Sequence, residues 1–237
     1  MKENIKSLFI SDVHLGSKGS NAKMVLKVLK KYKPEELFIV GDFIDGWLLK
    51  RRNYWTQDYT NLIRKILSYS KKGTKITYIT GNHDDFLREY VPLELENIQI
   101  INECIRNDYF ITHGDLYDGV VKLKWLGKLG AWGYETAIGV DILLKKIGYK
   151  KSLSSFLKKK VKRAVVFMTS FERQLAYQAL SRNCKGVICG HIHNPNDKII
   201  QIKDQSIHYL NCGDWIENNS YIIELYTGEI KLCYLKN

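Results

Sequence analysis

Histidines are the residues of this 237-residue chain whose placement points most directly to chemistry. Of the 6 His, five follow a short apolar run within a few residues: His14, His83, His113, His191 and His193. Asp, Asn and Gly share the same short clusters. Neutral imidazole with carboxylate and amide oxygens is a ligand set that suits Mn²⁺, Zn²⁺ or Fe. The histidines therefore predict a metal site assembled from several segments of the chain.

The number and spacing of the donors indicate two metal ions. The candidate ligands are Asp12, His14, Asp42, Asn82, His113, His191 and His193. In an extended chain residues i and i+2 point the same way, so the Asp-x-His and His-x-His pairs each direct two donors to one place. Seven donors exceed the needs of one tetrahedral ion and suit two ions that share a carboxylate. Two metals about 3.5–4 Å apart form the clamp used for in-line displacement at phosphorus.

Five short apolar runs must position these donors. They cover residues 7–11, 37–40, 76–80, 109–112 and 187–189, and each ends in a polar cluster. Almost wholly apolar runs of this length are typical of strands buried on both faces. Segments 22–32 and 54–69 carry apolar residues at helical spacing. Strands that alternate with helices predict a parallel sheet, whose ligands gather beyond the carboxyl ends of the strands.

Five motifs occur in a fixed order between residues 12 and 193: Asp-x-His, Gly-Asp-x-x-Asp, Gly-Asn-His-Asp, His-Gly and Gly-His-x-His. This series resembles the calcineurin-like metallophosphoesterases from about residue 5 to residue 194. The resemblance implies an α/β fold, a four-layer αββα sandwich of two mixed β-sheets flanked by helices. It also implies a phosphoester hydrolase with two divalent metal ions, Mn²⁺ first, with Zn²⁺ or Fe as alternatives.

The same resemblance implies a role for each motif residue. The ligands form two groups with one shared member: Asp12, His14 and His193 on one ion, Asn82, His113 and His191 on the other, and Asp42 bridging them. His83 would lie beside the scissile phosphate as a general acid, and Asp84 would steer it. Asp45 would support the ligands without binding metal itself.

A narrower likeness involves Gly41–Trp47, His113–Asp115 and Gly213–Trp215. These segments resemble the UDP-2,3-diacylglucosamine pyrophosphatase branch, which cleaves a diphosphate in the lipid A pathway and releases UMP and a phosphorylated acyl sugar. His83 departs from that pattern, which has Arg there. An alkoxide leaving group needs a proton, which His can supply, whereas a phosphate leaving group needs only charge stabilisation. A phosphodiesterase, nuclease or other phosphoesterase of the same fold therefore stays open as the alternative.

Positive charge is concentrated in one segment. The chain carries a net charge of +12, and Val120 to Arg163 holds 12 Lys and Arg against 2 acidic residues. We expect a single domain over residues 1–237, with a basic helical insertion at 118–181 that acts as a lid over an amphiphilic, phosphate-bearing substrate. The candidate substrate-binding residues are Lys158, Lys159, Lys162 and Arg163. An anionic membrane surface would use the same features, and nucleic acid is less favoured because no exposed stacking series of aromatics is evident.

Composition excludes several other classes of protein. Hydrophobic residues make up 45% and only 3 residues are Pro, which excludes a disordered or collagenous chain. No apolar run reaches the roughly 18 residues needed to span a bilayer, and no signal-peptide core follows the first residues. We therefore expect a cytoplasmic protein with peripheral contact at the inner face of a membrane. A scaffold that has lost its chemistry is disfavoured, because all seven ligand positions hold competent donors.

Overall fold

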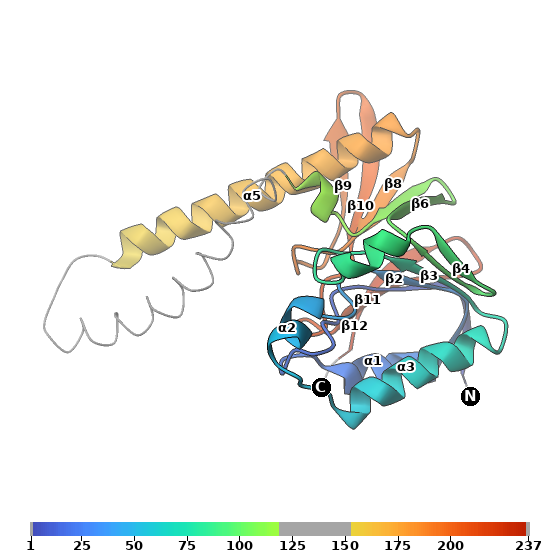
Figure 1. Cartoon of the computed structure of the whole chain (residues 1–237). Helices are drawn as coiled ribbons and strands as arrows, with labels where there is room; N and C mark the ends of the chain where they lie inside the picture. Colours follow the sequence, from blue (N-terminus) through green and yellow to red (C-terminus); the bar gives the residue numbers. More distant parts are fainter. Residues whose placement is uncertain (1, 119–152, 236–237) are drawn as a thin grey trace, which may run out of the picture. The chain divides into compact units, whose positions relative to one another are not determined.

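A computed structural model of the chain describes residues 2–118 and 153–235, and these form two β-sheets with flanking helices (Figure 1). The larger sheet has the strand order β12-β11-β1-β2-β3-β5-β4, and the smaller has the order β6-β7-β8-β10-β9. The strands of the larger sheet are β1 (Glu3–Ile10), β2 (Tyr32–Val40), β3 (Lys75–Ile79), β4 (Leu93–Leu95), β5 (Ile98–Ile101), β11 (Ser220–Glu224) and β12 (Ile230–Tyr234). Those of the smaller sheet are β6 (Glu103–Arg106), β7 (Tyr109–Thr112), β8 (Gly186–Cys189), β9 (Asn196–Ile202) and β10 (Gln205–Asn211).

Both sheets have a parallel centre and antiparallel edges. In the larger sheet β1, β2, β3 and β5 are parallel neighbours, while β11, β12 and β4 pair antiparallel. In the smaller sheet β7, β8 and β10 are parallel, and β6 and β9 pair antiparallel at the edges. Within each sheet the parallel strands therefore end on one side, which is where the predicted donors follow them.

The two sheets pack face to face. Phe9 of β1 and Phe38 of β2 stack with ring centroids 4.7 Å apart, and they share one buried cluster with Ile111, Ile188 and Leu210 of the smaller sheet. Side chains of successive strand residues point to opposite faces. The alternate residues of β1 and β2 therefore enter a second cluster on the other face, with the first helices of the chain.

Helices form the two outer layers. α1 (Ala22–Lys31) and α3 (Gln57–Ser70) lie on the larger sheet (Figure 1) and bury residues at helical spacing, such as Val25, Leu29 and Leu62. α5 (Leu153–Ser181) ends at the smaller sheet. Leu175 near this end is fully buried, and Arg182 just beyond it places its guanidinium 4.3 Å from the ring centroid of Phe110 in β7. The predicted four-layer sandwich is confirmed.

Contacts divide the chain into two compact units, one of Met1–Asp115 with Leu175–Asn237 and one of Leu116–Gln174. All seven predicted ligands belong to the first unit. The predicted insertion, residues 118–181, lies partly outside the described residues. Side chains of the predicted substrate-binding residues also lie outside them, namely Lys158, Lys159, Lys162 and Arg163. Their roles, and the lid, stay predictions. Within residues 2–118 and 153–235 no helix combines the length and the apolar character that spanning a bilayer requires.

Short elements that the sequence did not predict lie near the strand ends. They are the helix α2 (Gly46–Arg51) and the 3-10 helices η1 (Asp85–Tyr90) and η2 (Asp115–Tyr117), with β4, β5 and β6 between η1 and η2 in the chain. α2 directly follows Asp45, and η1 directly follows Asp84. Two of the predicted site residues thus stand at helix starts.

Candidate metal centre

Every predicted metal ligand lies just beyond the carboxyl end of a strand. Asp12 and His14 follow β1, Asp42 follows β2, Asn82 follows β3, His113 follows β7, and His191 and His193 follow β8. The donors thus come from both sheets.

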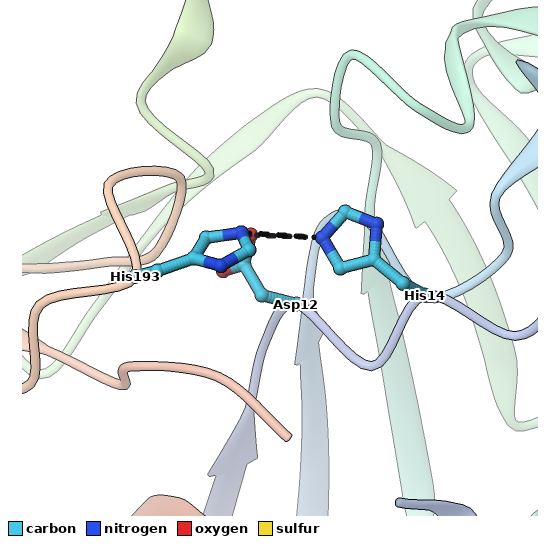
Figure 2. Close-up of side chains that lie close together, drawn as sticks. All are labelled: Asp12, His14 and His193. Atoms are coloured by element: carbon cyan, nitrogen blue, oxygen red, sulfur yellow. Dashed lines mark hydrogen bonds and ion pairs between the residues drawn. The ribbon is translucent and has the colours of Figure 1, made fainter. Parts of the chain in front are cut away.

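Asp12, His14 and His193 form the first cluster of possible ligands (Figure 2). Asp12 Oδ1 lies 3.1 Å from Nε2 of His193 and 3.7 Å from Nε2 of His14, and the two Nε2 atoms are 3.2 Å apart. His193 comes from the smaller sheet and the other two residues from the larger. One carboxylate oxygen and two imidazole nitrogens converge, which is a suitable three-ligand set for a divalent ion.

A second cluster joins Asp42 and His113 to Asp12. Asp42 Oδ2 lies 3.3 Å from Nε2 of His113 and 3.9 Å from Nε2 of His14. Asp42 Oδ2 therefore lies between His14, a predicted ligand of one ion, and His113, a predicted ligand of the other. This is the position expected of a carboxylate that bridges two ions. The ring of His191 packs edge to face on that of His113, with centroids 5.2 Å apart.

In each of three carboxylates, one oxygen accepts a hydrogen bond from the backbone and the other oxygen faces a histidine. Asp12 Oδ2 accepts a hydrogen bond from the backbone N–H of His191 at 3.0 Å. Asp42 Oδ1 accepts from the backbone N–H of His83 at 2.7 Å. Asp45 Oδ1 caps the start of α2 by accepting from a backbone N–H at 2.8 Å. The backbone thus fixes the orientation of all three carboxylates.

The ring of His113 is oriented in the same way. Its Nδ1 lies 2.9 Å from the carbonyl oxygen of Val40. Because a carbonyl can only accept, Nδ1 carries a proton, and Nε2 is the nitrogen left to bind a metal ion. A second partner that fixes the tautomer is typical of metal-binding histidine.

Unsatisfied buried atoms test whether the site fits metal ions. In the described part of the chain, five buried side-chain atoms have no hydrogen-bond partner, and four belong to this site: Asp12 Oδ1, Asn82 Oδ1, His83 Nδ1 and His113 Nε2. A buried polar atom without a partner costs about 1–3 kcal/mol. Three of the four are atoms that the sequence assigns to metal, so the residues present fit a pair of divalent cations.

The backbone at most of the predicted ligands adopts a left-handed conformation. Five predicted ligands have positive φ: Asp12 at 52°, His14 at 51°, Asp42 at 52°, His191 at 71° and His193 at 51°. The expectation that the Asp-x-His and His-x-His pairs are extended is therefore wrong, although both pairs reach the site. Such conformations cost about 1–3 kcal/mol each and cluster at functional sites.

Glycines let the strand ends approach one another. A Cβ on Gly41 would collide with the ring of His113, and one on Gly81 would collide with the carboxylate of Asp42. A Cβ on Gly190 would collide with Ser11 and with the carboxylate of Asp12. The glycines of three motifs are therefore required by the close packing of the ligands.

The charges of the site depend on one another. Burial alone would raise the pKa of Asp12, but His113, His14 and His193 hold it well below its ordinary value. Burial would lower the pKa of His14, but Asp12 and Asp45 outweigh burial and raise it to about 10. Asp42 and Asp12 likewise raise the pKa of His113 against the effect of burial. Without metal, protonated imidazoles balance the buried carboxylates, and divalent cations would replace those protons.

Asp84 has a different place from the one expected. It is fully buried and accepts hydrogen bonds from the Tyr78 hydroxyl at 2.6 Å and from the backbone N–H of Phe43 at 2.9 Å. The carboxylate that faces His83 is that of Asp45, with Oδ2 3.0 Å from Nδ1. Asp45 is thus the carboxylate placed to steer His83, and Asp84, to which the sequence assigned this role, instead accepts hydrogen bonds from Tyr78 and Phe43. Its burial, together with nearby Asp42, raises the pKa of Asp84.

From the sequence, no role at the site was assigned to Trp47. Its ring, in the first turn of α2, lies on the ring of His83 with centroids 4.3 Å apart and an interplanar angle of 36°. Trp47 is 39% exposed, and the His83 side chain is 26% exposed. His83 is thus held between a carboxylate and an indole at the open side of the site. The contact depends on α2, which has too few residues to give a helical pattern.

Comparison with known proteins agrees with this geometry. The sequence pattern of the family described as calcineurin-like phosphoesterase matches residues 5–195. The chain belongs to this family. Members use divalent metal ions, and the chain is a phosphoester hydrolase.

Similar curated proteins share one name, UDP-2,3-diacylglucosamine hydrolase. The protein from Porphyromonas gingivalis is 22% identical and that from Psychromonas ingrahamii 25% identical, each over 92% of this chain and 93% of its own length. The protein from Vibrio vulnificus is 23% identical over 91% of this chain and 92% of its own. Among solved structures, a dimetal phosphatase from Danio rerio covers 96% of this chain and 95% of its own, with 11% identity and a TM-score of 0.47, a similarity too low to support an argument.

Proposed function

We propose that this protein hydrolyses the diphosphate bond of a UDP-linked diacylated glucosamine lipid, releasing UMP and a lipid phosphate, with two Mn²⁺ ions. The observation that carries the reaction class is the convergence of Asp12, Asp42, His14, His113 and His193 from two sheets. The substrate class rests on the curated relatives, which extend over almost the whole chain.

The chain's own residues would bind the ions and orient the phosphate. Asp12, His14 and His193 would hold one ion, Asn82, His113 and His191 the other, and Asp42 would bridge them. When bound, two divalent cations supply Lewis acidity at the phosphate and lower the pKa of water. Donors from five separate strand ends would hold the two ions. Because the backbone fixes these donors, a bound phosphate would be held in one orientation.

His83 would act at the leaving group. Its Nδ1 lies 3.0 Å from Asp45 Oδ2, so this nitrogen faces the carboxylate, and the other, Nε2, would face substrate. A departing phosphate needs no proton, and a protonated His83 would stabilise its charge. The basic segment from Val120 to Arg163 is proposed to meet the phosphates and the acyl chains at the inner face of a membrane.

One observation favours a second candidate. His83 can give a proton to an alkoxide, which the Arg of the pyrophosphatase pattern cannot do. A diester or monoester with a poor leaving group is therefore the alternative substrate, as in a phosphodiesterase or nuclease of the same fold.

Incubation with Mn²⁺ and UDP-2,3-diacylglucosamine tests the proposal, with UMP as the measured product. We expect UMP release that stops when a chelator is added. His83→Arg should preserve or improve this reaction while lowering turnover of an alkyl phosphodiester by about 10²–10⁴-fold. If no UMP forms while a diester is hydrolysed fast, the lipid substrate is wrong and the second candidate is favoured. The proposed metal centre is not affected by this outcome.

A further inference from the structure

The edge of the larger sheet opposite the metal centre carries a group of lysines. β1, β2 and β3 are parallel, so their first residues share the edge away from the metal ligands. Because α1 and α3 return from the carboxyl ends of strands, they end at this same edge. We call the group formed by Lys2, Lys30, Lys33, Lys65, Lys72 and Lys75 the lysine edge.

A cleft of about 480 Å³ opens at the lysine edge. Lys33, Lys72 and Lys75 line it, and buried Thr74 and exposed Tyr226 form further parts of its wall. Small-molecule sites in proteins have volumes of about 300–1,000 Å³. The cleft is thus large enough for a ligand of nucleotide size.

Positive charge exceeds negative charge in this cleft. Its lining includes two acidic residues, Glu35 and Glu36. Arg106 forms an ion pair with Glu36, and the Tyr226 hydroxyl donates to Glu35 at 3.2 Å. Among the described side chains, no acidic group lies within ion-pair distance of any lysine of the lysine edge. The ammonium groups of Lys33, Lys72 and Lys75 therefore line the cleft, and only the carboxylate of Glu35 is left among its lining residues to balance them.

Lysines crowd one another next to the cleft. Lys2 and Lys65 both lie over the ring of Tyr69, at 5.7 Å and 4.5 Å from its centroid. Burial, with Lys2, Lys72 and Lys30 nearby, lowers the pKa of Lys65 to about 8. Like charges held together in this way repel one another, and a bound anion would relieve that repulsion.

Helix ends explain only part of the arrangement. Cations in the last turn of a helix are stabilised by its dipole, which accounts for Lys30 of α1 and for Lys72 just beyond α3. Lys33 and Lys75 stand on strands, and the dipole gives no reason for them to line a cleft.

We propose that the cleft of the lysine edge binds a small phosphate-bearing anion of the size of a nucleoside phosphate. Phosphate oxygens accept charge-assisted hydrogen bonds from lysine ammonium groups, here those of Lys33, Lys72 and Lys75. The ring of Tyr226, a 57% exposed residue, offers a face on which a base can stack. A concave cleft suits a solute better than the flat surface of a bilayer. The site is independent of the proposed function, because it lies on the other edge of the sheet.

Calorimetric titration of the full chain with inorganic pyrophosphate and with AMP tests the site. The variant K33Q/K72Q/K75Q removes three cations from the cleft, and K23Q/K185Q/K231Q removes three that are paired with Asp58, Asp108 and Glu229. Each lost charge-assisted hydrogen bond should weaken binding about tenfold. We expect a large loss in the cleft variant and little change in the control variant.

Two titration results would overturn the proposal. Unchanged binding in the cleft variant would place the anion at the metal centre, and equal losses in both variants would show a response to net charge alone. Thermal melting checks that each variant is folded, and the single variants K72Q and K75Q keep the test available if the triple variant is not. Co-sedimentation with phosphatidylcholine vesicles, with and without phosphatidylglycerol, distinguishes a lipid source. Loss of vesicle binding in the cleft variant, with no binding of either soluble probe to the wild type, also contradicts the proposal.

Discussion

Asp45 Oδ2 lies 3.0 Å from Nδ1 of His83, while Asp45 Oδ1 accepts a hydrogen bond from the first turn of α2. The same Oδ2 lies 3.4 Å from Nδ1 of His14, a predicted metal ligand. One carboxylate, fixed by a helix start, thus contacts both a predicted metal ligand and His83, the residue proposed to act at the leaving group. The histidines in turn hold the pKa of Asp45 below its ordinary value, against the effect of burial.

Replacing Asp45 by Asn should therefore slow the reaction without removing the metal ligands. Loss of a residue that orients a ligand typically costs about 10–100-fold in activity or metal affinity. We expect Asp45→Asn to lower kcat by that factor and to change the pH profile of kcat. Asp58→Asn, on the exposed side of α3 beside Lys23, is the matched control. Wild-type kcat and an unchanged profile in Asp45→Asn would show that the contact has no role in the reaction.

The stack of Trp47 on His83 predicts a second effect on rate. Trp47→Ala removes one of the two contacts that hold the imidazole, so we expect kcat to fall about tenfold, because small misplacements of a reacting group are costly. Trp55 has nearly the same exposure, 40% against 39%, and packs on Tyr59 instead. Trp55→Ala should leave kcat near the wild-type value. Equal kcat values for the two variants would argue against a positioning role for Trp47.

Gly190 provides a steric test of the ligand packing. An added methyl group would collide with Ser11 and with the Asp12 carboxylate, so Gly190→Ala must displace a predicted ligand. We expect a loss of about 1–3 kcal/mol in the free energy of unfolding and weaker Mn²⁺ binding, by thermal melting and calorimetry. Gly19→Ala is the control, since the nearest atom to its new Cβ is a side-chain methyl carbon of Ile216, at 3.2 Å, and no predicted ligand lies there. Wild-type stability and metal affinity in Gly190→Ala would contradict the close packing.

Metal removal should make the stability of the protein fall with rising pH. Asp12 and Asp45 raise the pKa of His14 from 6.5 to about 10, against the effect of burial. In the metal-free protein, protonated His14 contributes to the free energy of unfolding. This contribution is complete below pH 6.5 and is lost as the pH rises toward 10. Mn²⁺ binds the neutral imidazole, so its affinity rises over the same interval. We expect the Tm of the metal-free protein to fall from pH 6.5 upward and the gain in Tm from Mn²⁺ to grow. A gain that shrinks with pH would contradict the assignment of His14.

The sequence predicted the parts of the site that depend on residue type. The strand ends near Ile10, Val40, Ile79, Thr112 and Cys189 are almost wholly apolar, and a polar donor follows each, so the buried strands and the candidate ligands could both be predicted. The four-layer arrangement was predicted only from the family resemblance. The parts that depend on local backbone geometry could not. Positive φ at the ligands leaves no pattern in residue type, since Asp and His also occur in ordinary turns.

The carboxylate that contacts His83 also could not be predicted from the sequence. Asp84 is its neighbour in the chain, but the loop turns that carboxylate toward Phe43 and Tyr78. Asp45 reaches His83 because α2 begins there, and a helix of 6 residues is too short to show a helical period. Chain neighbours are therefore a poor guide to which carboxylate contacts which histidine.

The number of bound metal ions tests the central claim most directly. After reconstitution with Mn²⁺ and removal of free ions by gel filtration, mass spectrometry of the metal should give two Mn²⁺ per chain in the wild type. Asp42→Ala, which removes the carboxylate between His14 and His113, should retain fewer than two. A folded wild-type protein that retains no divalent metal at any concentration tested, and hydrolyses phosphoesters equally well with a chelator present, would contradict the account.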